Sequence, residues 1–436
     1  MSAIHEHERG TEAHDELPAH SWAAHIGPGL VSTATDNDPS GVVTYSLAGA
    51  QFGYDMLWTC LLSYPSMVAF QLVAARIAAQ TGKGLTVNMR EHYSRLLFYL
   101  AVMRFLIANI VNIAADVVAM GVGAQLVWHG SVPLYAAAFG MLSMALQWFV
   151  PYARYASVLK WSAACLFAYV GVAVVSHAPW QTLAFHAVVP RFTWSVDYFT
   201  MLLAVLGTTI SPYLLFSQAE QQIEEQRPHS PSQSRMGHAA CDTGNAQLRK
   251  VRRDTLLRTV LSNAVGLFIM AAAAMTLHST GHSLNNAYDA ASVLRPLVDG
   301  YASQVVGVAF IGTALLALPP LAGSAANAAV SARDQQVGKQ RNRPVAWALL
   351  GVMVLGTTIG VALALAHVEP IRALYWSAVL NGSTATPVMV MLVLLSMKRS
   401  AIGDLSAHWS LRALCWLATV FAGVALVARF ACEWLS

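Results

Sequence analysis

The sequence has few charged residues. Asp, Glu, Lys and Arg make up 11% of its 436 residues, whereas soluble globular proteins carry about 25%. Hydrophobic residues reach 56%, and the mean hydropathy is +0.50. This composition excludes an ordinary soluble domain and predicts an integral membrane protein that lies in a lipid bilayer. The formal net charge of +4 is small, and we expect no nucleic-acid partner.

The sequence also lacks the patterns of several other protein classes. No CxxC spacing occurs among the five cysteines, which argues against a thiolate metal site and a disulfide framework. No nucleotide-binding loop and no nucleophile–base set is present, so we expect neither an enzyme nor a cofactor. The N-terminal segment is polar through Ser21 and acidic, so we expect no cleavable signal peptide.

Eleven stretches are long enough to cross a bilayer as helices, which takes about 20 mostly apolar residues. They are residues 28–52, 54–79, 98–128, 132–150, 156–176, 198–219, 255–277, 301–330, 344–367, 370–396 and 411–434. Lys and Arg gather after every second span. The positive-inside rule therefore predicts a cytoplasmic N-terminus and, with an odd number of spans, an external C-terminus. Residues 1–27 are expected to form a disordered cytoplasmic tail, and residues 220–254 a flexible cytoplasmic loop.

Two of these spans are interrupted by proline in the same way. The first contains Ala34–Gly41 (ATDNDPSG), and the sixth contains Gly207–Tyr213 (GTTISPY). An ordinary kink would explain either Pro39 or Pro212 alone. The breaks, however, fall in corresponding members of two five-helix halves, which is typical of transporters built from inverted repeats. The pair therefore favours a transporter with its binding site near the middle of the membrane.

Two carboxylates lie beside the first break. Asp36 and Asp38 are placed at a depth where a charged side chain costs roughly 2.5 to 3.5 kcal/mol. Something must compensate for this cost, and a bound cation is the simplest candidate.

Several short segments resemble NRAMP divalent-metal transporters. They are Gly27–Leu30 (GPGL), Asp38–Gly41 (DPSG), Ala48–Tyr54 (AGAQFGY), Gln80–Leu85 (QTGKGL) and Arg90–Tyr93 (REHY). The likeness is dense over about the first 130 residues, returns at the sixth span and is weak in the C-terminal third. The resemblance implies an all-α LeuT-type fold and uptake of a divalent metal ion into the cytoplasm.

The same resemblance implies two inverted repeats of five helices plus one extra helix. Residues 28–176 would form the first repeat, residues 198–396 the second, and residues 411–434 the extra helix. We expect a monomer in the bacterial cytoplasmic (inner) membrane, with divalent metal ions and the lipid bilayer as its partners.

The sequence departs from the NRAMP pattern at the positions that hold the metal. The family usually has Asp-Pro-Gly-Asn in the first helix, and its Asp and Asn bind metal; Asp38 is kept, but Gly41 takes the Asn position. The sixth helix usually has Met-Pro-His, with the Met sulfur and an Ala carbonyl on the metal. Ser211 replaces the Met, Tyr213 replaces the His, and Thr208 stands at the carbonyl position. The thioether, which favours softer transition metals, is therefore absent.

The groups around the two breaks are oxygen donors only. They are Asp36, Asn37, Asp38 and Ser211, together with carbonyls freed around the two prolines. An all-oxygen site suits Mg²⁺, Ca²⁺ or Mn²⁺. Because Mg²⁺ keeps several of its waters, small residues such as Ser40, Gly41 and Ser211 would make room for a partly hydrated ion. Mg²⁺, with Mn²⁺, is the expected cargo, as in the NRAMP-related magnesium transporters, which also lack the methionine.

Part of the proton route implied by the resemblance is missing. Proton-coupled NRAMPs use an Asp and a Glu on the third helix, with the sixth-helix His nearby. Asp116 matches the Asp, but Ala119 stands where the Glu belongs; Asn112 lies one turn before Asp116 on the same face. These losses argue against proton coupling, although Asp36, which the family does not usually have, is an alternative proton carrier.

Two other functions stay open at this point. One is a proton-coupled Mn²⁺/Fe²⁺ symporter of the usual NRAMP type. The other is an organic-solute transporter of the same fold, in which half-helix N-termini bind a substrate carboxylate. Asp36 and Asp38 oppose the second, because they would repel an anionic group.

Overall fold

The structure is a computed structural model that describes residues 36–226, 240–333, 342–398 and 409–435. Within these ranges the regular structure is helical, and no β-strand occurs. The helices are α2 (Pro39–Phe52), α3 (Leu57–Thr81), α4 (Leu85–His92), α5 (Arg95–Trp128), α6 (Val132–Phe149), α7 (Tyr152–Ala164), α8 (Ala168–Val175), α9 (Trp180–Val188), α10 (Val196–Thr209), α11 (Pro212–Gln226), α12 (Ala240–Thr276), α13 (Ala287–Ser292), α14 (Arg295–Val298), α15 (Ala302–Ala332), α16 (Asn342–Leu365), α17 (Pro370–Leu395) and α19 (Trp409–Leu435).

Ten stretches among the described residues are long and apolar enough to cross a membrane. They match the second to eleventh predicted spans, with ends shifted by a few residues. The fifth, Arg154–Val175, combines α7 and α8 through a short 3₁₀ turn. The first predicted span, 28–52, is described only from residue 36, and α2 forms its second part.

The predicted flexible loop at residues 220–254 is largely wrong. Helix α11 continues to Gln226, and α12 already begins at Ala240. The reason is that the flanking sequence, rich in Glu, Gln, Lys and Arg, is polar enough for a loop yet consists of good helix formers. Residues 227–239 and the predicted tail, 1–27, lie outside the described residues.

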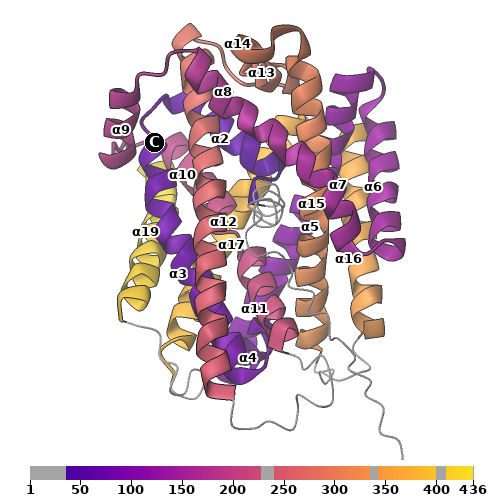
Figure 1. Ribbon diagram of the computed structural model, residues 1–436, viewed down its shortest axis with the longest axis vertical. Coiled ribbons are helices and arrows are strands. Elements are labelled where there is room, and N and C mark those ends of the chain that lie inside the picture. The colour runs from indigo at the N-terminus through magenta and orange to yellow at the C-terminus, as the bar shows by residue number, and fades with distance from the viewer. Residues whose placement is uncertain (1–35, 227–239, 334–341, 399–408, 436) are drawn as a thin grey trace, which may run out of the picture.

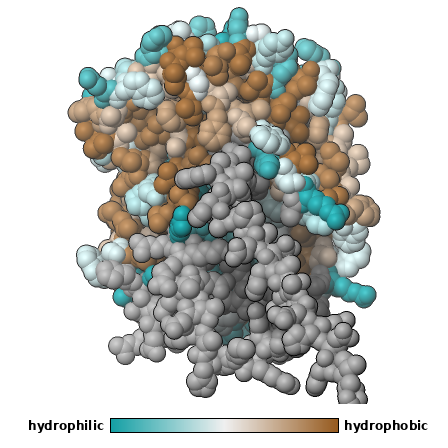
Figure 2. All heavy atoms as spheres, in the orientation of Figure 1, coloured by the Kyte–Doolittle hydropathy of each residue, from teal (hydrophilic) through white to brown (hydrophobic). Residues whose placement is uncertain are grey.

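The two ends of the helix bundle differ in what they carry. Figure 1 shows α9, α13 and α14 at one end, and α4 with the start of α12 at the other. The charge distribution predicts that the α4 end is cytoplasmic. Between the ends, the visible face is largely hydrophobic in its upper half, and hydrophilic residues gather at its top edge (Figure 2). Large hydrophobic side chains such as Leu96, Phe149 and Trp434 are exposed, as expected where lipid covers a protein.

Glycines bring the central helices into close contact. A Cβ atom on Gly123 of α5 would lie 2.7 Å from the carbonyl oxygen of Gly307 of α15. Likewise, a Cβ atom on Gly207 of α10 would lie 2.4 Å from the backbone nitrogen of Gly382 of α17. Such small-residue contacts let helix backbones approach without side chains between them. They fix α10, and the break that follows it, against the rest of the bundle.

Candidate functional site

The sixth span is broken where the sequence predicts. Residues 210–211 separate α10 from α11, and Pro212 begins the second half-helix. The Ser211 Oγ atom lies 2.6 Å from the carbonyl oxygen of Gly207 and 3.2 Å from that of Thr208, so its hydroxyl donates to the end of α10. Because a hydroxyl has one proton and two lone pairs, the Ser211 oxygen keeps acceptor capacity for a cation.

In the described part of the first span, residues 37–38 are not helical, and Asp38 lies at this break directly before α2. Asp38 caps α2, which begins at Pro39. Its Oδ1 atom accepts hydrogen bonds from the Gly41 N–H at 2.7 Å and the Ser40 hydroxyl at 2.8 Å, while Oδ2 accepts one from the Asn112 amide at 3.3 Å. The side chain is 5% exposed. Donors from the N-terminus of α2 and from α5 therefore hold a buried carboxylate in a fixed orientation.

Asn37 connects the same break to α12. Its Nδ2 atom donates to the Ser262 carbonyl at 3.2 Å and to the Ser262 hydroxyl at 3.0 Å. Sequence analysis missed Ser262, because a single serine in an apolar span carries no signal of the partner it meets 225 residues away. The contact orients the Asn37 amide so that its nitrogen faces α12.

Asp116 and Tyr213, the residues predicted for a proton route or a supporting role, are buried near Asp38. Asp116 is fully buried on α5, one turn after Asn112, and neither of its carboxylate oxygens has a hydrogen-bond partner among the described residues. Tyr213 is 3% exposed on the first turn of α11, and its phenol interacts electrostatically with Asp38 and Asp116. Both side chains thus face the same buried region.

Asp36 lies at the boundary between this region and a cavity. The cavity has a volume of about 350 Å³ and lies between α11, α12 and α15. Its lining includes Asp36, Gln218, Arg258 and Asn327, and it reaches the exposed side chain of Gln221 toward the α4 end. It therefore connects the carboxylate at the first break with the end of the molecule that is predicted to be cytoplasmic.

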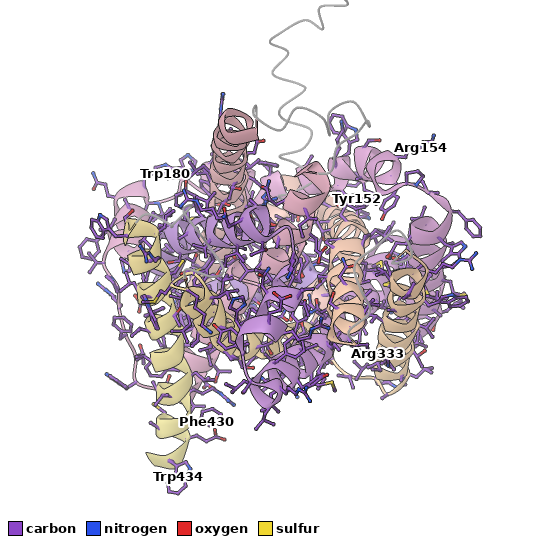
Figure 3. All side chains as sticks on the ribbon, turned by 90° about the horizontal axis from the view of Figure 1, so that it is seen from below. Tyr152, Arg154, Trp180, Arg333, Phe430 and Trp434 are labelled. Atoms are coloured by element: carbon purple, nitrogen blue, oxygen red, sulfur yellow. The ribbon has the colours of Figure 1, made fainter. Side chains whose placement is uncertain are left out.

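The wall of the cavity is completed by the start of α7. Tyr152 lines the cavity, and its hydroxyl lies 3.4 Å from the Leu316 carbonyl of α15. Figure 3, seen from the α4 end, shows Tyr152 beside α15 and Arg154 further out at the edge of the molecule.

Toward the α13 end, the region above the break is packed closed. Residues 39–50 of α2 are all buried. A Cβ atom on Gly49 would lie 2.1 Å from the Met270 carbonyl oxygen of α12, and one on Gly266 would lie 2.8 Å from the Tyr45 ring. The described residues therefore give the site a cavity on the α4 side and close helix packing on the α13 side.

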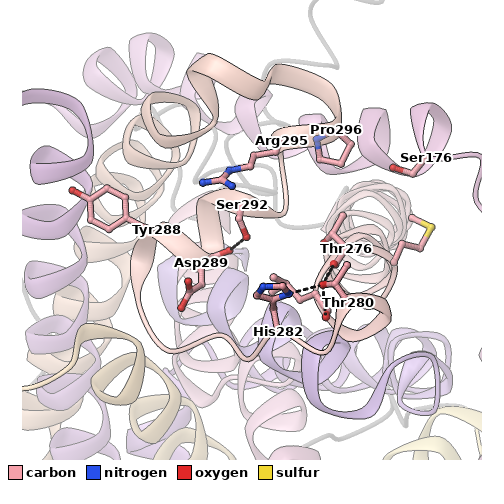
Figure 4. A pocket seen from close by; sticks show the side chains of 11 residues that line it. Ser176, Thr276, Thr280, His282, Tyr288, Asp289, Ser292, Arg295 and Pro296 are labelled. Carbon is pink, nitrogen blue, oxygen red and sulfur yellow. Dashed lines mark hydrogen bonds between the residues drawn. The ribbon is translucent and has the colours of Figure 1, made fainter.

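A larger cavity at the α13 end is separate from both breaks. It has a volume of about 650 Å³, and Figure 4 shows His282, Asp289 and Arg295 around it. Asp289 accepts hydrogen bonds from the Asn285 and Asn286 backbones, and His282 Nδ1 lies 2.9 Å from the Thr280 hydroxyl. These polar groups hold the loop and the start of α13, so the size of the cavity does not make it the functional site.

The donors around the two breaks are chemically suited to a hard cation. Among the described residues, no group of three or more His, Cys, Asp and Glu gathers in one place. The buried carboxylates of Asp36 and Asp38, with hydroxyl, amide and carbonyl oxygens, form the available set. Such an incomplete protein shell fits an ion that retains water, as Mg²⁺ does. Gly41 has no side chain, and its N–H donates to Asp38. It can therefore contribute to a metal site only by leaving room for the ion and by offering its carbonyl oxygen.

Two spans that break before a proline within a helical membrane bundle indicate a class of protein, the LeuT-type membrane transporters. Comparison with known proteins places the chain within that class. The family model for natural resistance-associated macrophage protein-like sequences matches residues 29–431. The chain therefore belongs to the Nramp family, and it is an integral membrane protein.

Curated relatives and solved structures agree with this assignment. The divalent metal cation transporter MntH of Burkholderia ambifaria is 24% identical over 406 residues, which cover 91% of this chain and 86% of the relative. MntH of Klebsiella pneumoniae is 25% identical and covers 90% of each chain. These relatives are named as transporters and not as enzymes, which agrees with the expectation from the sequence.

Solved structures confirm the LeuT-type fold. A variant of the Eremococcus coleocola manganese transporter has a TM-score of 0.72 at 15% identity, covering 94% of this chain and 87% of its own. A nucleobase–cation symporter in a closed conformation has a TM-score of 0.56 at 11% identity, covering 94% and 92%. At these identities the likeness concerns the fold alone.

Proposed function

We propose that this protein carries divalent metal cations into the cytoplasm by alternating access, with a preference for the hard ions Mg²⁺ and Mn²⁺. The single observation that carries the proposal is the buried carboxylate of Asp38, which lies at the break before α2 and is held by hydrogen bonds from α2 and α5. Desolvated carboxylates in a membrane need a compensating charge. A divalent cation supplies it, and the MntH relatives are named for carrying such ions.

The preference for hard ions rests on the donor atoms. Asp36, Asp38, Asn37 and Ser211 offer oxygen, and the carbonyl of Thr208 lies at the end of α10 beside Ser211. A site without sulfur loses the advantage that thioethers give to softer metals. The membrane potential drives entry by about 2.3 kcal/mol per charge per 100 mV. We propose that transport takes place in a bacterial inner membrane and requires one copy of the chain.

A second candidate is a proton-coupled Mn²⁺/Fe²⁺ symporter. The buried carboxylate of Asp116, which has no hydrogen-bond partner among the described residues, favours it as a potential proton carrier. Ala119 stands where proton-coupled NRAMPs have a Glu, and Tyr213 stands where they have a His. Both replacements disfavour a proton-coupled symporter. An organic anion as substrate is disfavoured more strongly, because Asp36 and Asp38 would repel it.

Metal flux into proteoliposomes, recorded together with internal pH, tests the proposal. We expect uptake of Mg²⁺ and Mn²⁺ without acidification, and we expect Asp38→Ala to abolish it because the buried carboxylate held by donors from α2 and α5 is lost. Asp254→Ala, at an exposed position of α12, is the matched control. Mn²⁺ uptake that excludes Mg²⁺ and acidifies the lumen would favour the second candidate. Unchanged uptake by Asp38→Ala would contradict the proposed site.

A further inference from the structure

We propose that Arg258 is a resident counter-ion for Asp36. The positive charge of Arg258 compensates the Asp36 carboxylate after the metal has left, so the empty transporter can reorient without a second cation. The proposal rests on the transport function proposed above. It concerns the step that returns the empty site to the outside, and not the binding of the metal itself.

The position of Arg258 follows from the spacing of polar residues on α12. Arg258 and Ser262 are four residues apart, so they lie on one face of the helix. Ser262 binds Asn37, the residue next to Asp36. Arg258 then lies one turn closer to the α4 end, where it lines the same cavity as Asp36. Its guanidinium interacts electrostatically with the Asp36 carboxylate.

Neutral groups hold the guanidinium in place. Its Nη2 atom donates to the Gln71 side-chain oxygen of α3 at 2.6 Å and to the Gln218 side-chain oxygen of α11 at 3.0 Å. No carboxylate among the described residues lies within ion-pair distance of it, and its Nε atom has no hydrogen-bond partner. The positive charge of Arg258 is therefore fixed in position without being cancelled by a permanent ion pair.

Asp36 is the complementary partner. Its side chain is 7% exposed, and its Oδ2 atom is buried without a hydrogen-bond partner among the described residues. A carboxylate in this position is costly unless a positive charge lies nearby. The distance from Arg258 exceeds that of a direct ion pair, so the carboxylate stays available to an incoming cation. Arginine is always charged in proteins, and it supplies this compensation without taking up a proton.

Glu220 is the other acidic residue that lines the cavity, and its position differs. Its carboxylate is packed against Gly84, the N-cap of α4, where an added Cβ atom would lie 2.4 Å from Oε1. It thus faces the start of another helix. Asp36 is the acidic residue of this cavity that adjoins Asp38, and its buried carboxylate needs compensation when the site is empty.

Net uptake and metal–metal exchange separate the two halves of the cycle. Net uptake requires the empty site to return, whereas exchange in vesicles preloaded with Mn²⁺ returns a loaded site. We expect Arg258→Gln to lower the ratio of net Mn²⁺ uptake to Mn²⁺ exchange by about tenfold, which corresponds to the loss of one modest electrostatic interaction. Arg253→Gln, an exposed position on the same helix, is the control and should keep the wild-type ratio.

Charge-matched variants make the test specific. Arg258→Lys keeps the positive charge and should largely keep the ratio. The double variant Asp36→Asn with Arg258→Gln removes both charges and should restore the ratio, even if both rates are lower. An equal loss of net uptake and exchange in Arg258→Gln, or no recovery in the double variant, would overturn the proposal. Failure of the proposed function itself would look different, because wild-type vesicles would then show no exchange that depends on Asp38.

Discussion

Ser211 stands at the position that decides whether the proposed metal site contains a sulfur donor. Its hydroxyl donates to the Gly207 and Thr208 carbonyls near the end of α10, and its oxygen lies at the break in the sixth span. Ser211→Met would place a thioether there, and thioethers favour softer metals. We expect the uptake preference to shift from Mg²⁺ toward Mn²⁺ and Cd²⁺ by about tenfold, equivalent to about 1.4 kcal/mol. Competition between Mg²⁺ and Cd²⁺ in the flux assay measures this shift.

Ser211→Ala is the appropriate control for that substitution. It removes the hydroxyl without adding sulfur, so it should weaken transport of all ions without favouring Cd²⁺. Equal changes in Mg²⁺ and Cd²⁺ uptake for Ser211→Met would show that this position does not contact the metal.

At the scale of single residues, the sequence identifies those that belong to local motifs. Asp38, Pro39 and Ser211 are visible because a carboxylate, a proline and a small polar residue interrupt apolar spans. Arg258 and Ser262 are not, because their meaning depends on contacts with segments far away in the chain. A local residue pattern can predict a break in a helix. The contact of α12 with that break depends on the fold and cannot be predicted from a local pattern.

Between whole helices, the contact of α10 with α17 leaves no room for added volume. A Cβ atom on Gly207 would lie 2.2 Å from the Ala378 carbonyl and 2.4 Å from the Gly382 nitrogen. These are backbone atoms, which cannot move aside as a flexible side chain can. We expect Gly207→Ala to destabilise the protein by about 1 to 3 kcal/mol, as overpacking of an interior does, and to slow flux by displacing the break that follows.

Thermal unfolding in detergent measures this effect. Gly351→Ala in α16 is the matched control, because no atom lies within 4 Å of the added Cβ. It should leave the unfolding temperature unchanged or raise it, since alanine is the better helix former. A fall of equal size in both variants would show that the close approach of α10 and α17 is not what Gly207 preserves.

The elements themselves were largely predictable because spans of about 20 apolar residues have few alternatives in a bilayer. Ten predicted spans recur, and α10 and α11 are separated at Pro212 as expected. The loop predicted at 220–254 failed for a related reason: beyond the bilayer, hydropathy no longer distinguishes a polar helix from a polar loop. Helix propensity in the Glu- and Gln-rich end of α11 was the better guide there.

For the whole molecule, the arrangement of cavity and packing corresponds to a state that exposes the site toward the α4 end. The cavity that includes Asp36 and Arg258 lies on that side, and α2 is packed against α12 on the other. Transport then requires the opposite arrangement, in which α2 and α12 separate. Because the counter-ion is part of the chain, the proposed cycle moves two net charges for each metal ion.

That charge count predicts a reversal potential. A tenfold gradient of metal is worth about 1.4 kcal/mol, and two charges crossing 100 mV are worth about 4.6 kcal/mol. The potential that stops net Mg²⁺ flux should therefore change by about 30 mV for each tenfold gradient and should not depend on a pH gradient. If one proton accompanied each metal ion, three charges would move, the slope would fall to about 20 mV, and a pH gradient would shift the reversal point by about 20 mV per unit. Proteoliposomes clamped with a potassium gradient and valinomycin measure both slopes, and vesicles with Asp38→Ala provide the background. A slope of 20 mV would mean that a proton enters with each metal ion, as in the second candidate function.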